Sequence, residues 1–117
     1  MRVLVVDDER PCLDELVYML EKQKNIEIAG TFTSPLEALK ASAVLKPDAA
    51  FLDLSMAHLS GADLARKLIA HIPGLKIVFV TAYAKELKKL KDSPAFGSLL
   101  KPVSEAKLKE LLWRLPS

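Results

Sequence analysis

The chain of 117 residues has a single cysteine, Cys12, and no long hydrophobic run. One cysteine cannot build a disulfide framework and suits a reducing compartment. No apolar stretch approaches the roughly 20 residues needed to span a bilayer, and the first apolar run meets Asp7 and Asp8 too early for a secretory signal. The formal net charge of +2 is too small to indicate direct nucleic-acid binding. We therefore expect a soluble cytoplasmic domain that neither enters a membrane nor binds nucleic acid itself.

Half of the residues are hydrophobic, and a chain of this length fits one domain with its own core. Short apolar runs alternate with segments of helical periodicity, without repeats or an interior linker. The run over residues 3–6 is continuous and β-branched, which indicates a strand covered on both faces. Further strands are expected at residues 26–32, 49–52, 77–80 and 98–100. Five β–α units in strict alternation predict an α/β fold with a parallel sheet and helices on both faces.

The helical segments carry their own start and stop signals. Ser34 and Glu37 stand at the N-cap and N3 positions of a capping box, and this helix should stop near Lys46 because Pro47 follows. The fourth helix is short and basic, and the last begins at Ser104. The five expected helices cover residues 12–20, 34–46, 61–72, 85–91 and 104–115.

Polar side chains fall where the expected strands end. Asp7 and Asp8 follow the first strand, Asp53 the third, Thr81 the fourth and Lys101 the fifth. In a flavodoxin-like sheet of order 2-1-3-4-5, ligands bind beyond the carboxyl ends of strands one and three. Three carboxylates crowded there repel one another unless a cation offsets them, and open oxygen sites favour Mg²⁺ or Mn²⁺. A hydroxyl and an ammonium beside them suit phosphoryl transfer.

These motifs together resemble a known family. Asp7-Asp8-Glu9, Leu52-Asp53-Leu54-Ser55-Met56, Gly61, Thr81-Ala82 and Lys101-Pro102 resemble, in order and spacing, the signature of receiver domains of bacterial two-component response regulators. The resemblance covers the whole chain, so residues 1–117 are expected to form a single receiver domain. It implies the flavodoxin/CheY-like doubly wound (βα)5 fold.

The resemblance also implies the roles of the acidic residues. Asp53 would accept a phosphoryl group from the phosphohistidine of a sensor histidine kinase. Asp8 and Asp53 would bind Mg²⁺ directly, and Asp7 through water. The backbone carbonyl of Ser55 would complete the protein ligands. The chain would then act as a phosphoacceptor that assists its own phosphorylation and dephosphorylation, and not as an enzyme with a separate substrate.

The remaining matched residues would sense the phosphoryl group. Thr81 would turn its hydroxyl toward it, and Lys101 would bind one of its oxygens. The Lys101-Pro102 bond resembles the family's cis peptide. Residues 81–103 most resemble receivers attached to LytTR-type or SARP/BTAD-like transcriptional modules. This favours the N-terminal domain of a longer regulator over a stand-alone receiver, with an output domain or partner protein. A homodimer is also open.

Two positions depart from the family pattern. Ala57 replaces a frequent proline, and Ser98 stands where the family usually has the aromatic that couples to the threonine. Phosphorylation is therefore expected to move residues 81–83 and the short basic helix directly, with little change in the fifth strand.

Two other classes of protein remain open. A Mg²⁺-dependent aspartyl phosphohydrolase of the haloacid-dehalogenase type requires Asp-x-Asp after the first strand, but Glu9 stands at the second aspartate position. A receiver-like scaffold that is never phosphorylated is favoured by Ser98 and disfavoured by the intact acids and Lys101.

Overall fold

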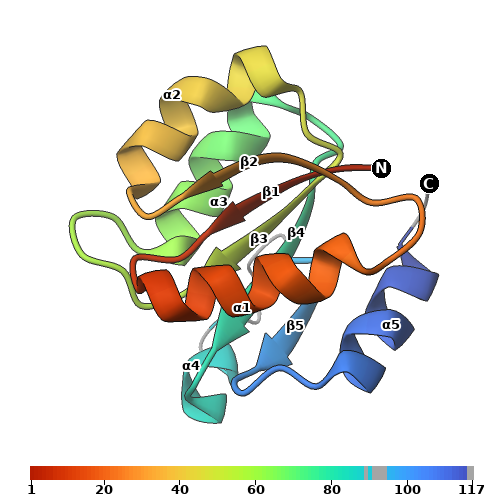
Figure 1. The fold of residues 1–117 in the computed structure, drawn as a ribbon. Coiled ribbons are helices and arrows are strands. Elements are labelled where there is room, and N and C mark those ends of the chain that lie inside the picture. Colours follow the sequence, from red (N-terminus) through yellow and green to blue (C-terminus); the bar gives the residue numbers. More distant parts are fainter. Residues whose placement is uncertain (89, 91–94, 116–117) are drawn as a thin grey trace.

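Five parallel strands form one twisted sheet in the order β2-β1-β3-β4-β5 (Figure 1). The structure is a computed structural model that describes residues 1–88, 90 and 95–115. The order is the flavodoxin-like one expected from the sequence, and each expected strand is present with its ends moved by one residue or less. The strands are β1 (Arg2–Val6), β2 (Glu27–Phe32), β3 (Ala49–Asp53), β4 (Lys76–Thr81) and β5 (Gly97–Leu100).

Helices cover both faces of this sheet, so the central strands are buried on two sides. One core joins β-strand residues such as Val5 and Phe51 to leucines of α1 and α5. The other joins Leu52 and Phe79 to α2 and α3. Burial on both faces explains why the strands are continuous apolar runs rather than alternating ones. The helices are α1 (Arg10–Glu21), α2 (Pro35–Leu45), α3 (Gly61–His71), α4 (Ala84–Lys88) and α5 (Glu105–Arg114).

The predicted start and stop of α2 are confirmed. The Ser34 hydroxyl accepts a hydrogen bond from the backbone N–H of Glu37 at 3.3 Å, which satisfies a free donor of the first turn. At the other end, Lys46 adopts a left-handed conformation with φ of 50°, because the following Pro47 disfavours helical backbone there. Ser104 caps α5 as expected, and Ser60 caps α3 in the same way.

The helix α4 is short and loosely attached. It is described over Ala84–Lys88, and Lys89 and Lys91 of the expected segment 85–91 lie outside the described residues. None of its residues is buried, and only Leu87 packs partly against the α2–α3 core. Little apolar area therefore holds α4 in place.

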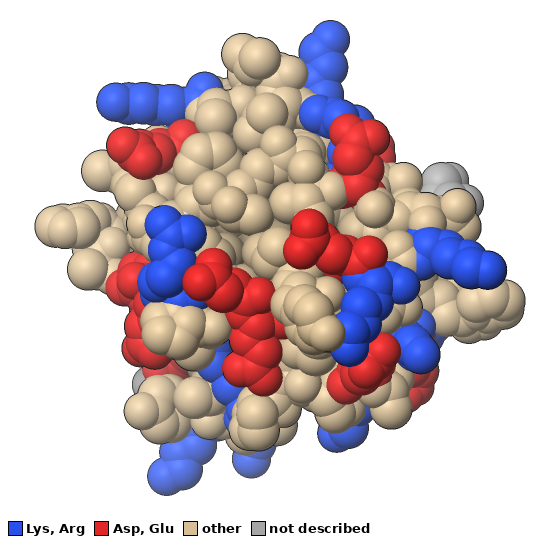
Figure 2. Space-filling model, viewed as in Figure 1, with Lys and Arg blue, Asp and Glu red and all other residues tan. Residues whose placement is uncertain are grey.

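The face that carries α1 and α5 has a mixed charge. Figure 2 shows acidic and basic side chains interspersed on the face that carries α1 and α5, without an extended area of one sign. Within the described residues, no helix has both the length and the apolar composition to cross a membrane.

Candidate functional site

Three carboxylates meet at the carboxyl ends of β1 and β3. Asp7 and Asp8 directly follow β1, and Asp53 is the last residue of β3, the neighbouring strand. One oxygen from each carboxylate lies within 4.8 Å of the others. Asp7 and Asp53 are only 3% and 5% exposed, whereas Asp8 faces solvent. The structure thus brings the three predicted acids together, as the strand order requires.

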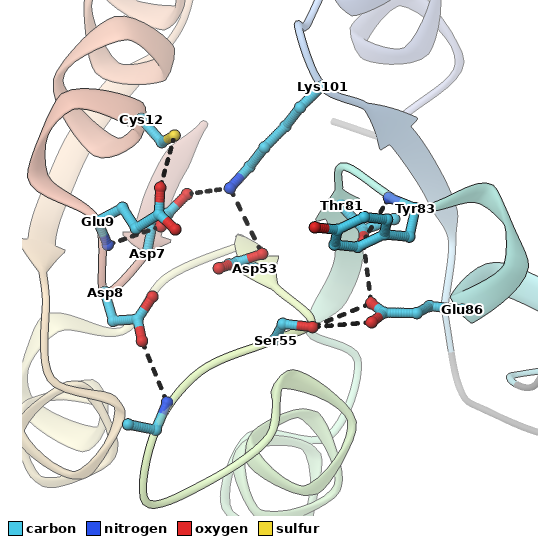
Figure 3. A network of polar contacts seen from close by, with 11 residues as sticks. Asp7, Asp8, Glu9, Cys12, Asp53, Ser55, Thr81, Tyr83, Glu86 and Lys101 are labelled. Atoms are coloured by element: carbon cyan, nitrogen blue, oxygen red, sulfur yellow. Dashed lines mark hydrogen bonds and ion pairs between the residues drawn. The ribbon is translucent and has the colours of Figure 1, made fainter.

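Lys101 reaches this cluster from the end of β5. Its Nζ lies 2.9 Å from Oδ2 of Asp7 and 3.5 Å from Oδ1 of Asp53 (Figure 3). The backbone N–H of Lys101 donates to the carbonyl of Thr81 at 2.8 Å, and the Lys101-Pro102 peptide is cis, as the resemblance implied. The backbone at the end of β5 therefore starts the lysine side chain beside Thr81, from where it extends to the buried acids.

The charges of the cluster are unbalanced. Burial raises the pKa of Asp53 to about 6, repulsion from Asp7 and Asp8 adds to this effect, and the Lys101 ammonium offsets part of it. For Lys101, burial alone would lower the pKa, but the hydrogen bond to Asp7 and the attraction of Asp53 hold it above its ordinary value. The ammonium therefore stays protonated between the two buried acids, and a shortage of positive charge remains.

The ligand set fits a hard divalent cation. Backbone N–H groups orient two of the carboxylates: that of Glu9 donates to Asp7 at 2.9 Å, and that of Ala57 donates to Asp8 at 3.1 Å. The exposure of Asp8 leaves one side of the cluster open to water. Mg²⁺ sites typically have few protein oxygens and open positions for water, and such a cation would balance the negative charge of the three carboxylates.

Thr81 and Ser55 lie beside the acids, but their hydroxyls turn away from them. The Thr81 hydroxyl lies 3.0 Å from Oε2 of Glu86 and accepts a bond from the N–H of Tyr83 at 3.2 Å. The Ser55 hydroxyl donates to the same Glu86 carboxylate (Figure 3). The sequence analysis did not identify Glu86 as a site residue. The one signal in the sequence was that Glu86 is a single acid among the lysines of the fourth helix.

Gly61 lies directly against the backbone of Asp53. A Cβ at this position would stand 2.2 Å from the Asp53 carbonyl oxygen and 2.9 Å from the Cα of Leu54. The Gly61 N–H donates to the Leu54 carbonyl at 2.9 Å. The start of α3 thus packs onto the residue after β3 only because no side chain intervenes.

Ser98 is exposed on β5, where it pairs with Phe79 of β4. The chain therefore has no aromatic side chain at this position that could change rotamer between an exposed and a buried orientation. A pocket of about 490 Å³ opens at the cluster, bordered by Asp53, Thr81 and Lys101 and by apolar residues of α1 such as Met19.

The fold is a doubly wound α/β domain in which three carboxylates and one lysine meet at the carboxyl edge of the sheet. Residues 3–112 match the family described as the response regulator receiver domain, so the chain belongs to this family. This confirms the main resemblance drawn from the sequence. The finer likeness to LytTR-type or SARP/BTAD-like regulators stays a prediction.

The curated relatives of this chain are longer proteins that it matches over part of their length. It is 39% identical over 116 residues to the transcriptional regulatory protein BtsR of Escherichia coli strain K12, covering 98% of this chain and 48% of BtsR. An uncharacterized response regulatory protein of Vibrio cholerae is 36% identical over 115 residues, with the same coverage of 98% and 48%. The chain therefore spans about half the length of the curated relatives it matches.

Solved structures agree with the fold. The response regulatory domain of protein mrkE from Klebsiella pneumoniae is 33% identical and superposes with a TM-score of 0.87 over 98% of this chain and 94% of that domain. The receiver domain of a modulated diguanylate cyclase from Desulfovibrio desulfuricans is 30% identical, with a TM-score of 0.84 over 96% of this chain and 90% of that one. Both are domains of other proteins, and a shared fold alone does not define the output.

Proposed function

We propose that this receiver domain accepts a phosphoryl group on Asp53 from a sensor histidine kinase in the cytoplasm. The observation that supports it is the meeting of Asp7, Asp8 and Asp53 with Lys101 at the edge between β1 and β3. Asp53 sits at the centre of this arrangement, with an ammonium on one side and an exposed carboxylate on the other. A carboxylate oxygen of Asp53 is the nucleophile that forms the acyl phosphate. Asp53 is the acid that both the Lys101 ammonium and a bound divalent cation can reach.

Mg²⁺ or Mn²⁺ would be held directly by Asp8 and Asp53, through water by Asp7, and by the backbone carbonyl of Ser55. When bound, the cation neutralises charge on the phosphoryl oxygens. Lys101 supplies the second positive charge, since its ammonium already reaches Asp53. Thr81 would then bind a third oxygen by turning its hydroxyl from α4 toward Asp53. In this role the domain assists its own phosphorylation and dephosphorylation.

The phosphorylated domain would switch an attached or separate output. BtsR is a transcriptional regulatory protein of which this chain matches about half, which supports a transcriptional output and an N-terminal place in a longer regulator. A LytTR-type or SARP/BTAD-like module is the output type that the sequence of residues 81–103 favours.

Labelling with a small phosphodonor tests the phosphoacceptor directly. Incubation with acetyl phosphate and Mg²⁺ should add the mass of one acid-labile phosphoryl group, and Asp53→Asn or Asp53→Ala should abolish it. Asp14→Asn, which changes an exposed acid of α1, is the matched control and should be labelled like the wild type. Turnover of the donor without a stable adduct would favour a phosphohydrolase, and no reaction at all would favour an unphosphorylated scaffold.

A further inference from the structure

Glu86 joins two hydroxyl groups that flank the acidic cluster. Its Oε2 lies 3.0 Å from the Thr81 hydroxyl, and its two oxygens lie 2.9 and 3.1 Å from the Ser55 hydroxyl. Figure 3 shows the Glu86 carboxylate extending from α4 toward both of them. These bonds link α4 to the ends of β4 and β3, across 5 and 31 residues of sequence.

The Thr81 hydroxyl has one hydrogen, and Glu86 uses it. An ionised carboxylate only accepts hydrogen bonds, so Thr81 is the donor in this pair. The other contact of the hydroxyl, the N–H of Tyr83, occupies a lone pair and leaves the hydrogen where it is. The oxygens of a phosphoryl group on Asp53 are also acceptors. Thr81 can therefore donate to Glu86 or to the phosphoryl group, but not to both at once.

We propose that Glu86 is a positioning residue that holds Thr81 in its unphosphorylated orientation and competes with the phosphoryl group for the hydroxyl hydrogen. This inference rests on the proposed phosphorylation of Asp53. Because Glu86 stabilises only the unphosphorylated arrangement, it lowers the affinity of the site for the phosphoryl group.

The same exchange carries the signal to α4. This helix has no buried residue, so its polar contacts to Thr81 and Ser55 act together with the partly buried Leu87 to hold it. When Thr81 turns to the phosphoryl group, α4 loses one of these two contacts. In a chain with exposed Ser98 in place of an aromatic, Glu86 thus supplies the link between the site and the surface.

The affinity for beryllofluoride, a phosphoryl mimic, measures this competition at saturating Mg²⁺. Glu86→Ala removes the competing acceptor and should bind the mimic about fivefold more tightly, as expected for one net hydrogen bond. Glu86→Gln keeps the shape with a weaker, neutral acceptor and should lie between Glu86→Ala and the wild type. Glu110→Gln removes one exposed carboxylate from α5 and should bind like the wild type.

A double-mutant cycle separates positioning of Thr81 from simple charge repulsion. In a Thr81→Ala background, Glu86→Ala should no longer change the affinity, because no hydroxyl remains to be held. In the protein without the mimic, scalar couplings should show one Thr81 side-chain rotamer in the wild type and averaging in Glu86→Ala.

Unchanged affinity in Glu86→Ala, or an equal gain in the Thr81→Ala background, would overturn the inference while leaving phosphorylation of Asp53 intact. If the wild type neither binds the mimic nor accepts a phosphoryl group, the proposed function fails, and the inference with it.

Discussion

Lys101 and Asp7 form the tightest ion pair of the described acidic cluster, with Nζ 2.9 Å from Oδ2, compared with 3.5 Å from Nζ to Asp53. Both side chains are largely shielded from solvent, so the pair is only weakly screened. The ammonium therefore rests mainly on Asp7 and leaves Asp53 incompletely neutralised. Burial and repulsion from Asp7 raise the pKa of Asp53, and the Lys101 ammonium offsets only part of this rise.

Divalent cations should stabilise the native state. Mg²⁺ needs the three acids brought together by the fold, so it binds the folded chain only. By mass action, Mg²⁺ at 100 times its dissociation constant should raise the free energy of unfolding by about 2.7 kcal/mol and raise the melting temperature accordingly. Asp8→Asn should remove most of this stabilisation without disturbing the core, since Asp8 is exposed. Thermal scans with and without Mg²⁺ measure it, and Asp14→Asn is the control. The same Mg²⁺ effect in Asp8→Asn would refute the assignment.

The charge on Asp53 should make the metal-free domain less stable as the pH rises. Its native pKa of about 6 lies above the ordinary value of 3.8, so the native state holds this proton more tightly than the unfolded chain. The free energy of unfolding should therefore fall as the pH rises through this window and stay lowered above it.

Asp53→Asn removes that penalty. In metal-free buffer near pH 7.5 it should stabilise the domain by roughly 2 kcal/mol, and near pH 4 it should match the wild type. Urea denaturation at both pH values measures the difference, with Asp14→Asn as the control. A destabilised Asp53→Asn near pH 7.5 would contradict the predicted sign.

Gly61→Ala should disturb the phosphoacceptor. The new Cβ would overlap the Asp53 carbonyl, so the start of α3 must move away, at a cost of about 1–3 kcal/mol in stability. Urea denaturation should report that loss, and labelling by acetyl phosphate should become slower. Gly97→Ala is the control, because its Cβ would meet only the end of the Leu111 side chain; its labelling rate should not change. Wild-type stability and labelling in Gly61→Ala would show that the close approach is unimportant.

Phosphorylation should move α4 more than β5. Burying a Tyr or Phe involves roughly 150–250 Å², and Ser98 has no such area to bury. Amide chemical shifts with and without beryllofluoride should change most at residues 81–88 and little at residues 98–100. Large changes centred on Ser98 with a still α4 would contradict this expectation.

Local sequence pattern was sufficient for the fold and for the candidate acids. Continuous β-branched runs such as residues 3–6 indicate doubly covered strands, and the Ser34 cap depends only on residues within one turn. Parallel strands end at one edge of the sheet, and the first and third strands are neighbours in the flavodoxin-like order, so acids placed after them converge.

Only the tertiary structure decided how the neighbouring side chains are engaged. Glu86 binds Ser55, which lies 31 residues away in the sequence. This contact depends on how α4 folds back over the ends of β3 and β4. That Lys101 lies nearer to Asp7 than to Asp53 depends on side-chain positions around a buried cluster. The requirement for Gly61 likewise follows from two backbones meeting in space. Each of these contacts is a distance between elements far apart in sequence, which hydrophobic periodicity and residue spacing do not encode.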